Sequence, residues 1–342
     1  MNLKELSQAL ELSQTTVSRA LNGYPEVSAE TRSRVEEMAR KLGYAPNQQA
    51  RRLATGRSMS IGHVIPRSLH EMMNPVFMEF IAGAGETYSR HGYDMIISVV
   101  EDHNVEAAYR EIASKKKTDA VMVHGPRSKD ERPALLKELG LPFLIHGRVP
   151  GLEHETSWID VNNGRAFERA TNLLLDLGHR RVALLNGLED MDFAARRRAG
   201  FDKAHHDRGL QTVPELLRAA DMTEPYGADS ALEMLKSPEP PTAFMVSSMI
   251  TAIGVARAIG LCGLKIGRDI SVITHDDALS FLPNCGDVPI FTCTRSSVRD
   301  AGSRAAQLLI EKILPNPDTI VSEHLEAELI IGQSTGPLPT QA

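Results

Sequence analysis

Beyond Met59 the chain repeats one pattern, in which short runs of apolar residues alternate with longer amphipathic segments. This alternation is typical of parallel β-sheets joined by crossover helices, so it favours an α/β fold for most of the chain. We predict strands at 61–65, 93–99, 120–124, 143–146, 181–185, 243–247 and 270–274, and helices at 76–90, 164–177, 196–208 and 250–258. Ligands of such folds collect at the carboxyl ends of the strands, where binding residues are therefore expected.

The first 45 residues follow a different pattern, that of short amphipathic helices. Helices are predicted at 3–10, 14–21 and 28–42. Asn2 and Ser13 are suitable N-caps, and Gly43 can end the last helix. The second helix has an apolar inner face and a polar outer face. Two short helices across a tight turn, completed by a third, form the layout of a helix-turn-helix DNA-binding domain, although the spacing alone also fits an ordinary three-helix bundle.

Charge is distributed unevenly along the chain. Its 342 residues carry a formal net charge of −6. Residues 1–57 contain nine Lys and Arg against six Glu, a net charge of +3, which leaves −9 for the rest. A basic head on an acidic body fits a small phosphate-contacting module attached to a part that need not touch DNA. The length itself suggests two or three domains.

Three phrases in the head resemble the DNA-binding signature of the lactose-repressor (LacI/GalR) family in order and spacing. They are Thr16-Val17-Ser18-Arg19-Ala20-Leu21-Asn22, Val27-Ser28-Ala29-Glu30-Thr31-Arg32 and Leu42-Gly43-Tyr44-Ala45-Pro46-Asn47. The resemblance favours the helix-turn-helix over the plain bundle. It implies a DNA-binding domain at 1–45 whose second helix lies in the major groove.

The same resemblance implies a role for individual side chains of this helix. The positions expected to read base edges, where amide and guanidinium groups can bond bidentately, hold Gln14, Thr15 and Arg19. The positions expected to contact the phosphate backbone hold Thr16, Ser18 and Asn22.

One position in the head departs from the family. The family usually has glycine in the turn where this chain has Glu11. A non-glycine residue with a positive φ angle costs on the order of 1 kcal/mol. Either the turn relaxes or the head is slightly less stable than its relatives.

The segment that follows the DNA-binding domain, 46–58, is prone to form a helix but has too little apolar surface to fold alone. Its composition is that of a basic linker. The resemblance implies instead a hinge helix that pairs with its dimer mate in the minor groove, where Leu53 wedges between base pairs and Ala50 permits close approach. Asn47 and Arg51 are also expected to contact DNA.

Within the predicted second domain, 59–342, residues 60–335 resemble the periplasmic-binding-protein-like core of the same family. The phrases that carry this likeness are Asn74-Pro75-Val76-Phe77, Leu177-Gly178-His179-Arg180-Arg181-Val182-Ala183, Arg197-Arg198-Ala199-Gly200-Phe201 and Asp269-Ile270-Ser271-Val272-Ile273-Thr274-His275-Asp276-Asp277. The predicted fold class is thus an all-α helix-turn-helix domain followed by an α/β two-lobed periplasmic-binding-protein-like domain for effector binding and dimerisation. The chain should cross between lobes near Val161, Pro289 and Val321, which assigns 59–160 and 290–320 to the first lobe and 161–289 and 321–335 to the second.

In the family a small molecule binds between the lobes. The positions expected to contact it hold Phe77, His124, Arg148, Trp158, Asn163, Arg197, Ser248 and Asp276. A guanidinium and a carboxylate can each bond two neighbouring hydroxyls of a sugar, and an aromatic ring can stack on its apolar face. Two of these residues have a plainer alternative. Trp158 can be a core residue, and Arg197, between Arg196 and Arg198, can be a solvated charge on a helix.

Two segments differ from most relatives. Ser247-Ser248-Met249 lacks the carboxylate that usually follows this strand, and Phe291-Thr292-Cys293-Thr294-Arg295 replaces a Thr-Thr run. The second segment, together with Pro142-Phe143-Leu144-Ile145-His146-Gly147-Arg148, looks most like regulators of α-glucoside use. The expected effector is a mono- or disaccharide, with an α-glucoside as the lead.

Several classes of protein are not favoured. The sequence has no phosphate loop, nucleophile elbow, H-E-x-x-H or dinucleotide-binding glycine motif, so we expect no enzyme, cofactor or metal. Cys262, Cys285 and Cys293 form no C-x-x-C pair and are expected to be buried free thiols. Neither a signal peptide nor a membrane-spanning run is apparent, so we expect a cytoplasmic, nucleoid-associated protein without a membrane partner.

The sequence therefore predicts a sequence-specific DNA-binding transcriptional regulator, a repressor of carbohydrate-utilisation genes that is controlled allosterically by a sugar. Its expected partners are double-stranded, pseudo-palindromic operator DNA, the sugar, and a second copy in a homodimer. Residues 332–342 lack the leucine heptads of a tetramerising tail. The alternative is a stand-alone sugar-binding protein, which would not need residues 1–57.

Overall fold

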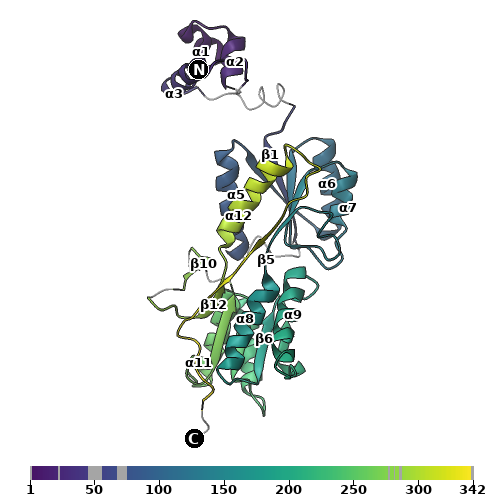
Figure 1. The fold of residues 1–342 in the computed structure, drawn as a ribbon, viewed down its shortest axis with the longest axis vertical. Helices are drawn as coiled ribbons and strands as arrows, with labels where there is room; N and C mark the ends of the chain where they lie inside the picture. The colour runs from purple at the N-terminus through teal and green to yellow at the C-terminus, as the bar shows by residue number, and fades with distance from the viewer. Residues whose placement is uncertain are drawn as a thin grey trace. The chain divides into compact units, whose positions relative to one another are not determined.

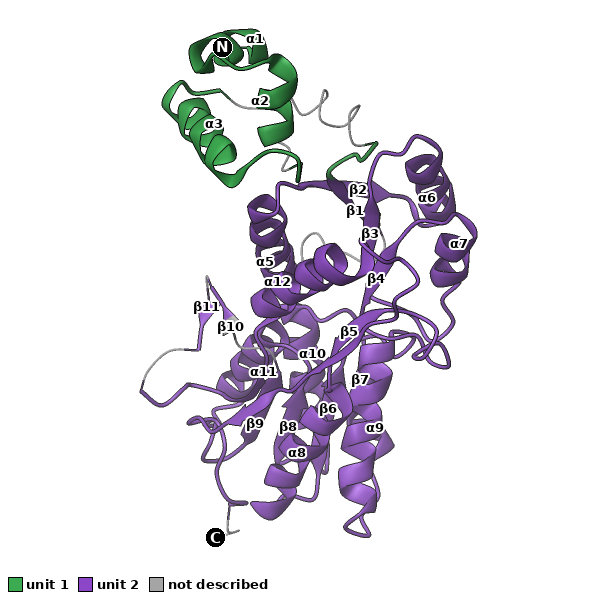
Figure 2. Cartoon of the chain, turned by 45° about the horizontal axis from the view of Figure 1, so that its top comes forward, with its two compact units in different colours: residues 1–59 green, residues 60–342 purple. Residues whose placement is uncertain are grey.

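The computed structural model describes residues 2–21, 24–44, 56–67, 75–275, 278–280, 282–284 and 287–339. The chain divides into two compact units, residues 1–59 and 60–342 (Figure 2). The expected hinge contacts Asn47, Ala50, Arg51 and Leu53 lie outside the described residues, as do Asn22 and Asp276. No helix in the described ranges is both long and apolar enough to span a bilayer.

The first unit is built from helices that pack around one small core. They are α1 (Leu3–Leu10), α2 (Gln14–Leu21) and α3 (Ala29–Lys41). The buried core side chains are Leu6, Leu10, Val17, Ala20, Val35 and Ala39. Asn2 and Glu5 form a capping box at α1, and the Ser28 hydroxyl caps α3 by accepting from the amide of Thr31. The helices predicted at 3–10, 14–21 and 28–42 are confirmed to within one residue at each end.

The turn between α1 and α2 keeps the left-handed conformation that glycine usually supplies. Glu11 has φ 55° and ψ 35°, and its amide hydrogen-bonds to carbonyls of the last turn of α1. The turn has therefore not relaxed to accommodate the side chain. A non-glycine residue in this region is strained because its Cβ crowds the neighbouring carbonyl oxygen.

Replacing Glu11 with glycine is accordingly expected to stabilise the first unit by about 1 kcal/mol, because the strain is removed. Amide hydrogen exchange in the full chain would show this as slower exchange across α1 and α2. Gly43→Ala is the matched control. Gly43 has φ +62° with open space around its Cα, so alanine should introduce the same strain and speed exchange at the end of α3. Faster exchange in the Glu11→Gly variant would contradict the strain at this turn.

The second unit contains two six-stranded sheets among its described residues, one for each lobe (Figure 1). The first sheet has the order β13-β5-β4-β3-β1-β2, with strands β1 (Ser60–Pro66), β2 (Asp94–Val100), β3 (Ala120–His124), β4 (Phe143–His146), β5 (Trp158–Val161) and β13 (Ser322–Leu325). Its pairs are parallel. Figure 1 shows helices α5 (Pro75–Arg90) and α12 (Val298–Leu308) on one side of this sheet and α6 (Val105–Ser114) and α7 (Arg132–Glu138) on the other.

The second sheet has the order β14-β12-β9-β8-β6-β7 and is parallel except for the pair β12 and β14. Its strands are β6 (Val182–Asn186), β7 (Leu217–Ala219), β8 (Ala243–Val246), β9 (Ser271–His275), β12 (Thr292–Arg295) and β14 (Glu328–Ile330). Its helices are α8 (Asn163–Asp176), α9 (Asp192–His206), α10 (Glu224–Leu235) and α11 (Met249–Leu261). A short hairpin, β10 (Ala278–Leu279) and β11 (Leu282–Pro283), lies beside it.

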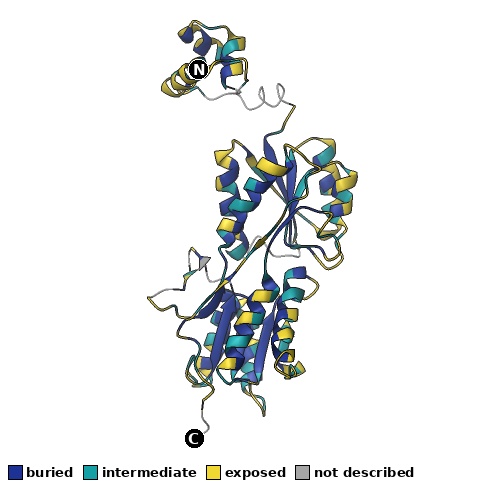
Figure 3. Cartoon of the chain, in the orientation of Figure 1, coloured by how far each residue is buried: buried dark blue, intermediate teal, exposed yellow. Residues whose placement is uncertain are grey.

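Successive side chains of a central strand point to opposite faces of the second sheet, and both sets are apolar. Helices therefore cover both faces. Val182 and Leu184 pack in one cluster with residues of α8 and α9, whereas Ala183 and Leu185 pack in another with residues of α10 and α11. Strands buried on both faces read as continuous apolar runs in the sequence. The strands β3, β6, β8 and β9 are accordingly buried throughout (Figure 3).

The positions at which the chain crosses between the lobes agree only in part with the positions predicted from the sequence. The first follows Val161, as predicted, because β5 belongs to the first sheet and α8 packs in the second lobe. The second lies after Arg295 rather than near Pro289, because β12 pairs with β9 before the chain enters α12. The third lies after Leu325 rather than near Val321, because β13 pairs with β5. The predicted lobe boundaries at 290 and 321 are therefore corrected to these positions.

Candidate functional sites

The outer face of α2 carries the polar side chains expected to meet DNA. Gln14, Thr15 and Arg19 are exposed, and Thr16 and Ser18 are half-buried. The helix is oriented by its inner face, because Val17 and Ala20 lie in the core. At its start the Ser13 hydroxyl accepts from the amide of Thr16 at 3.0 Å. The unit thus presents an amide, hydroxyls and a guanidinium on one helical surface, which are the groups that read base edges.

Two other arginines of this unit hold the helices together. Arg34 donates from Nη2 to the carbonyl of Leu10 at 2.8 Å, which ties α3 to the end of α1. Arg32 donates from Nη2 to the carbonyl of Tyr24 at 2.9 Å. Their guanidinium groups satisfy backbone oxygens within the domain, so they help to fix the position of α2.

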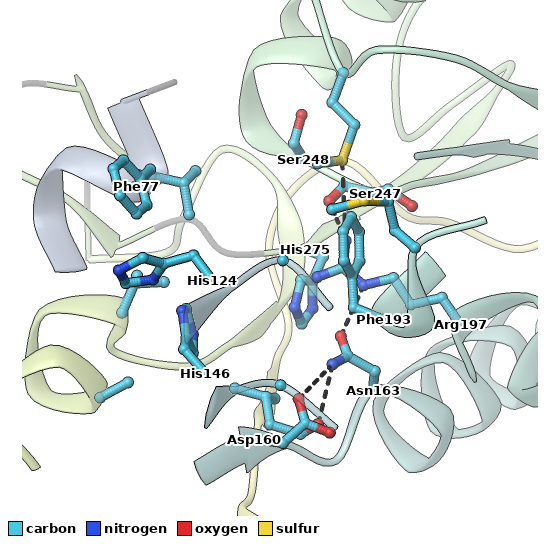
Figure 4. A pocket seen from close by; sticks show the side chains of 18 of the residues that line it. Phe77, His124, His146, Asp160, Asn163, Phe193, Arg197, Ser247, Ser248 and His275 are labelled. Atoms are coloured by element: carbon cyan, nitrogen blue, oxygen red, sulfur yellow. Dashed lines mark hydrogen bonds between the residues drawn. The ribbon is translucent and has the colours of Figure 1, made fainter. Parts of the chain in front are cut away.

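A cavity lies between the lobes of the second unit, at the carboxyl ends of strands from both sheets (Figure 4). It has about 960 Å³ of empty space, part of it open to solvent. Its lining consists of Val76, Phe77, His124, Gly125, Pro126, His146, Gly147, Asp160, Val161, Asn163, Met191, Phe193, Arg197, Met222, Ser247, Ser248, His275, Val298 and Ala301. A concave site with an apolar lining and a few convergent polar groups is typical of small-molecule binding.

Most of the predicted effector residues line this cavity. They are Phe77, His124, Asn163, Arg197 and Ser248. Arg148 and Trp158 do not line it. The Trp158 indole packs in the core of the first lobe and donates from Nε1 to the carbonyl of Glu153 at 2.9 Å, so the plainer alternative of a core residue describes it.

The second lobe supplies a polar wall of Asn163, Arg197 and Ser248, beside which Met191, Phe193 and Met222 also line the cavity. Arg197 is only 6% exposed, so it is not a solvated helix charge. Its Nε donates to Asn163 Oδ1 at 2.8 Å, and its Nη1 donates to the carbonyl of Ser247 at 2.9 Å. The guanidinium carbon lies 4.7 Å from the ring centre of Phe193. These contacts fix the plane of the guanidinium before any ligand arrives.

The first lobe supplies aromatic and apolar side chains to the lining, together with the carboxyl group of Asp160. His124 Nε2 and His63 Nδ1 lie 2.8 Å apart in one hydrogen bond, and the Phe77 ring meets the His124 ring edge-on. Burial lowers the pKa of His63 to about 3 and holds the pKa of His124 well below its usual range. Both imidazoles are therefore neutral at pH 7, and His124 offers the cavity a polar group without a charge.

Residues at the ends of strands complete the lining and were absent from the sequence-based prediction. His146 ends β4, and His275 ends β9, so the rule that ligands collect at strand ends would have found both. Asp160 lies in β5, a four-residue strand with too little apolar character to be predicted. Ser247 precedes the predicted Ser248, and Phe193 lies about one helical turn before the predicted Arg197, but no further signal in the sequence marks either residue.

The two lobes are tied to each other at the edge of the cavity. The amide of Ser128 donates to the carbonyl of Asp190 at 2.9 Å, and the amide of Asp192 donates to the carbonyl of Pro126 at 3.0 Å. Arg127 adds an ion pair with Asp190 at 2.7 Å. A molecule bound in the cavity contacts both lobes, so it is placed to alter how they close on each other.

Comparison with known proteins gives matches for both units. Residues 2–47 match the family described as bacterial regulatory proteins, lacI family, and residues 171–335 match the periplasmic binding protein-like domain. The HTH-type transcriptional regulator AglR of Rhizobium meliloti (strain 1021) is 45% identical over 343 positions, covering 100% of this chain and 96% of that relative. The HTH-type transcriptional regulator RafR of Escherichia coli is 35% identical, covering 81% and 82%.

Solved structures show the same fold. A lac repressor dimer bound to operator and the anti-inducer ONPF has a TM-score of 0.79 at 24% identity, covering 98% of this chain and 99% of that one. A complex of the transcriptional regulator CelR with cellobiose has a TM-score of 0.72 at 24% identity, with the same coverage.

Proposed function

Because the chain belongs to the lacI family of bacterial regulatory proteins, we propose that a small sugar held between its two lobes controls its binding to operator DNA. The chain is a DNA-binding transcriptional regulator rather than an enzyme. The finer proposal is that it represses carbohydrate-utilisation genes as a homodimer on the nucleoid, with α2 in the major groove and Asn47, Ala50, Arg51 and Leu53 in a minor-groove hinge.

One observation supports the sugar most strongly, namely that hydrogen-bonding groups and apolar surface line the same cavity. Arg197, Asn163 and Ser248 form a polar wall that can bond hydroxyls, and Val76, Phe77 and Phe193 give apolar surface. A pyranose ring has hydroxyls around its edge and an apolar face, so it matches both kinds of surface. Asp276 is proposed as a further contact of the sugar. Trp158 is not, because its indole packs in the core of the first lobe. The segments around Arg148 and Thr292 support an α-glucoside.

The experiment that tests this function is a thermal-shift screen of the purified full chain with maltose, sucrose, trehalose, glucose and galactose. A sugar present at a hundred times its Kd should stabilise the protein by about 2.7 kcal/mol. Sorbitol is the matched control, because it has a similar number of hydroxyls but no ring with an apolar face, and it should give no shift. The sugar proposal fails if none of the five sugars raises the Tm more than sorbitol does.

A further inference from the structure

Arg148 lies outside the cavity lining, yet it is connected to the cavity through a buried ion pair. Its Nε donates to Asp160 Oδ2 at 2.7 Å, and the two side chains are only 11% and 6% exposed. The guanidinium also lies over the Trp158 ring, 5.2 Å from its centre. An ion pair this well buried keeps both groups in one geometry, because breaking it leaves a charge without water or partner.

Asp160 continues the connection into the second lobe through Asn163. Asn163 Nδ2 lies 3.4 Å from Asp160 Oδ1 and 3.0 Å from the carbonyl of Val161. An arginine can only donate, so the Asn163 atom that faces Arg197 must be the oxygen. The amide nitrogen must then face acceptors, and Asp160 supplies one of them. The Asn163 amide is thus held by Arg197 at its oxygen, and by the carbonyl of Val161 and the more distant carboxylate of Asp160 at its nitrogen (Figure 4).

This series of contacts follows the first crossing between the lobes. Arg148 and Asp160 belong to the first lobe, Asn163 begins α8 in the second, and Arg197 lies on α9. The strand β5 that carries Asp160 also pairs with β13, which leads to the third crossing. The side chains therefore join the polar wall of the cavity to the segments about which the lobes must move.

We propose that Arg148 and Asp160 are positioning residues, which hold Asn163 and, through it, Arg197 in the orientation that receives the sugar. Neither needs to touch the ligand to affect its binding. This inference rests on the proposed function, because it takes Arg197 to contact a sugar in the cavity.

The charge on Asp160 makes the arrangement sensitive to pH. Burial raises the pKa of Asp160 to about 6, although Arg148 opposes the shift. The other charged or titratable groups that face it are Asp192 and Arg196 of α9, and His324 is its neighbour in register on β13. A protonated carboxyl loses its charge and turns one oxygen into a donor, so it cannot serve both Arg148 and Asn163. Sugar affinity is therefore expected to rise as the pH increases through about 6.

The test measures sugar affinity by calorimetry from pH 5 to pH 8, with whichever of maltose, sucrose and trehalose gives the largest thermal shift. The wild-type affinity should rise roughly tenfold across pH 6, the effect of about one hydrogen bond to a charged group. Asp160→Asn keeps the volume and should remove this step, leaving the low affinity at every pH. Arg148→Met should move the step to higher pH, because Asp160 then loses the cation that lowers its pKa.

Two further variants separate positioning from a general loss of structure. Asp130→Asn removes a carboxylate from a comparable buried pair with Arg132, at 2.6 Å with side chains 4% and 13% exposed, which does not lead to Arg197. The sugar affinity of this Asp130→Asn variant should change with pH as the wild-type affinity does. In an Asn163→Ala background, Asp160→Asn should weaken binding no further, since its effect passes through Asn163.

The outcomes distinguish this inference from the function on which it rests. If the wild type binds none of the three sugars, the α-glucoside proposal fails and this inference falls with it. If the wild type binds but all variants share its pH profile, the function stands and the positioning role is wrong. Full additivity of the Asp160 and Asn163 changes would likewise overturn it.

Discussion

Replacing Arg19 with alanine is expected to weaken operator binding by about 1–3 kcal/mol, a loss of roughly 5- to 150-fold in affinity. Arg19 is exposed on the outer face of α2, where Val17 and Ala20 anchor the helix to the core. A guanidinium in this position can bond two acceptors on one guanine, and alanine loses both bonds. Sugar affinity should remain unchanged, because the cavity lies in residues 60–342.

The measurement is a gel-shift titration on a duplex that the wild-type protein selects from a random library. Arg40→Ala is the matched control, because Arg40 is an exposed arginine of the same unit that lies on α3. It removes the same charge and should cost far less affinity. Equal losses from both variants would mean that Arg19 contributes only charge, contrary to its base-reading role.

Replacing Arg197 with lysine is expected to weaken sugar binding roughly 10- to 100-fold while leaving operator affinity without sugar unchanged. The guanidinium donates to Asn163 Oδ1 and to the carbonyl of Ser247 from different nitrogens and lies over the Phe193 ring. An ammonium keeps the charge but cannot reproduce this planar set of contacts. The variant should therefore bind DNA and no longer respond to sugar at concentrations that act on the wild type.

Arg198→Lys is the control for this prediction. Arg198 is the next residue of α9, but it pairs with Asp202 and Glu189 near the surface. Surface pairs of this kind contribute little, so its sugar response should match the wild type. Calorimetry gives the sugar affinity, and gel shifts with and without sugar give the response. A wild-type sugar affinity in Arg197→Lys would exclude the arginine from the binding site.

The sequence predicted those parts of the fold where local pattern and tertiary structure agree. The central strands β1, β3, β6, β8 and β9 are buried on both faces, so their apolar runs are unambiguous. The strands β5, β12, β13 and β14 are three or four residues long and carry polar side chains. Each of these strands forms because a neighbouring strand completes its hydrogen bonds. The sequence of the segment itself does not show which strand that neighbour is. The lobe crossings at Arg295 and Leu325 were misplaced for this reason.

In the candidate site, too, the sequence predicted single residues only where a local pattern marks them. Phe77 and Arg197 could be placed at the cavity by resemblance, because each sits within a recognisable phrase. Trp158 could not be assigned correctly, because only the fold brings its indole nitrogen to the carbonyl of Glu153. The pairing of Arg148 with Asp160 joins residues twelve positions apart on adjacent segments of the first lobe. The family resemblance implied a direct contact between Arg148 and the ligand, but Arg148 lies outside the cavity lining.

Sugar and DNA are proposed to bind at separate sites whose affinities are linked, and the reciprocity of this linkage can be measured directly. Operator Kd should be measured with and without saturating sugar, and sugar Kd with and without saturating operator, in one buffer at one salt concentration. Each ligand should change the affinity for the other by the same factor, in the range of 5- to 150-fold typical of allosteric coupling. Sugar binding that leaves operator affinity unchanged would contradict it.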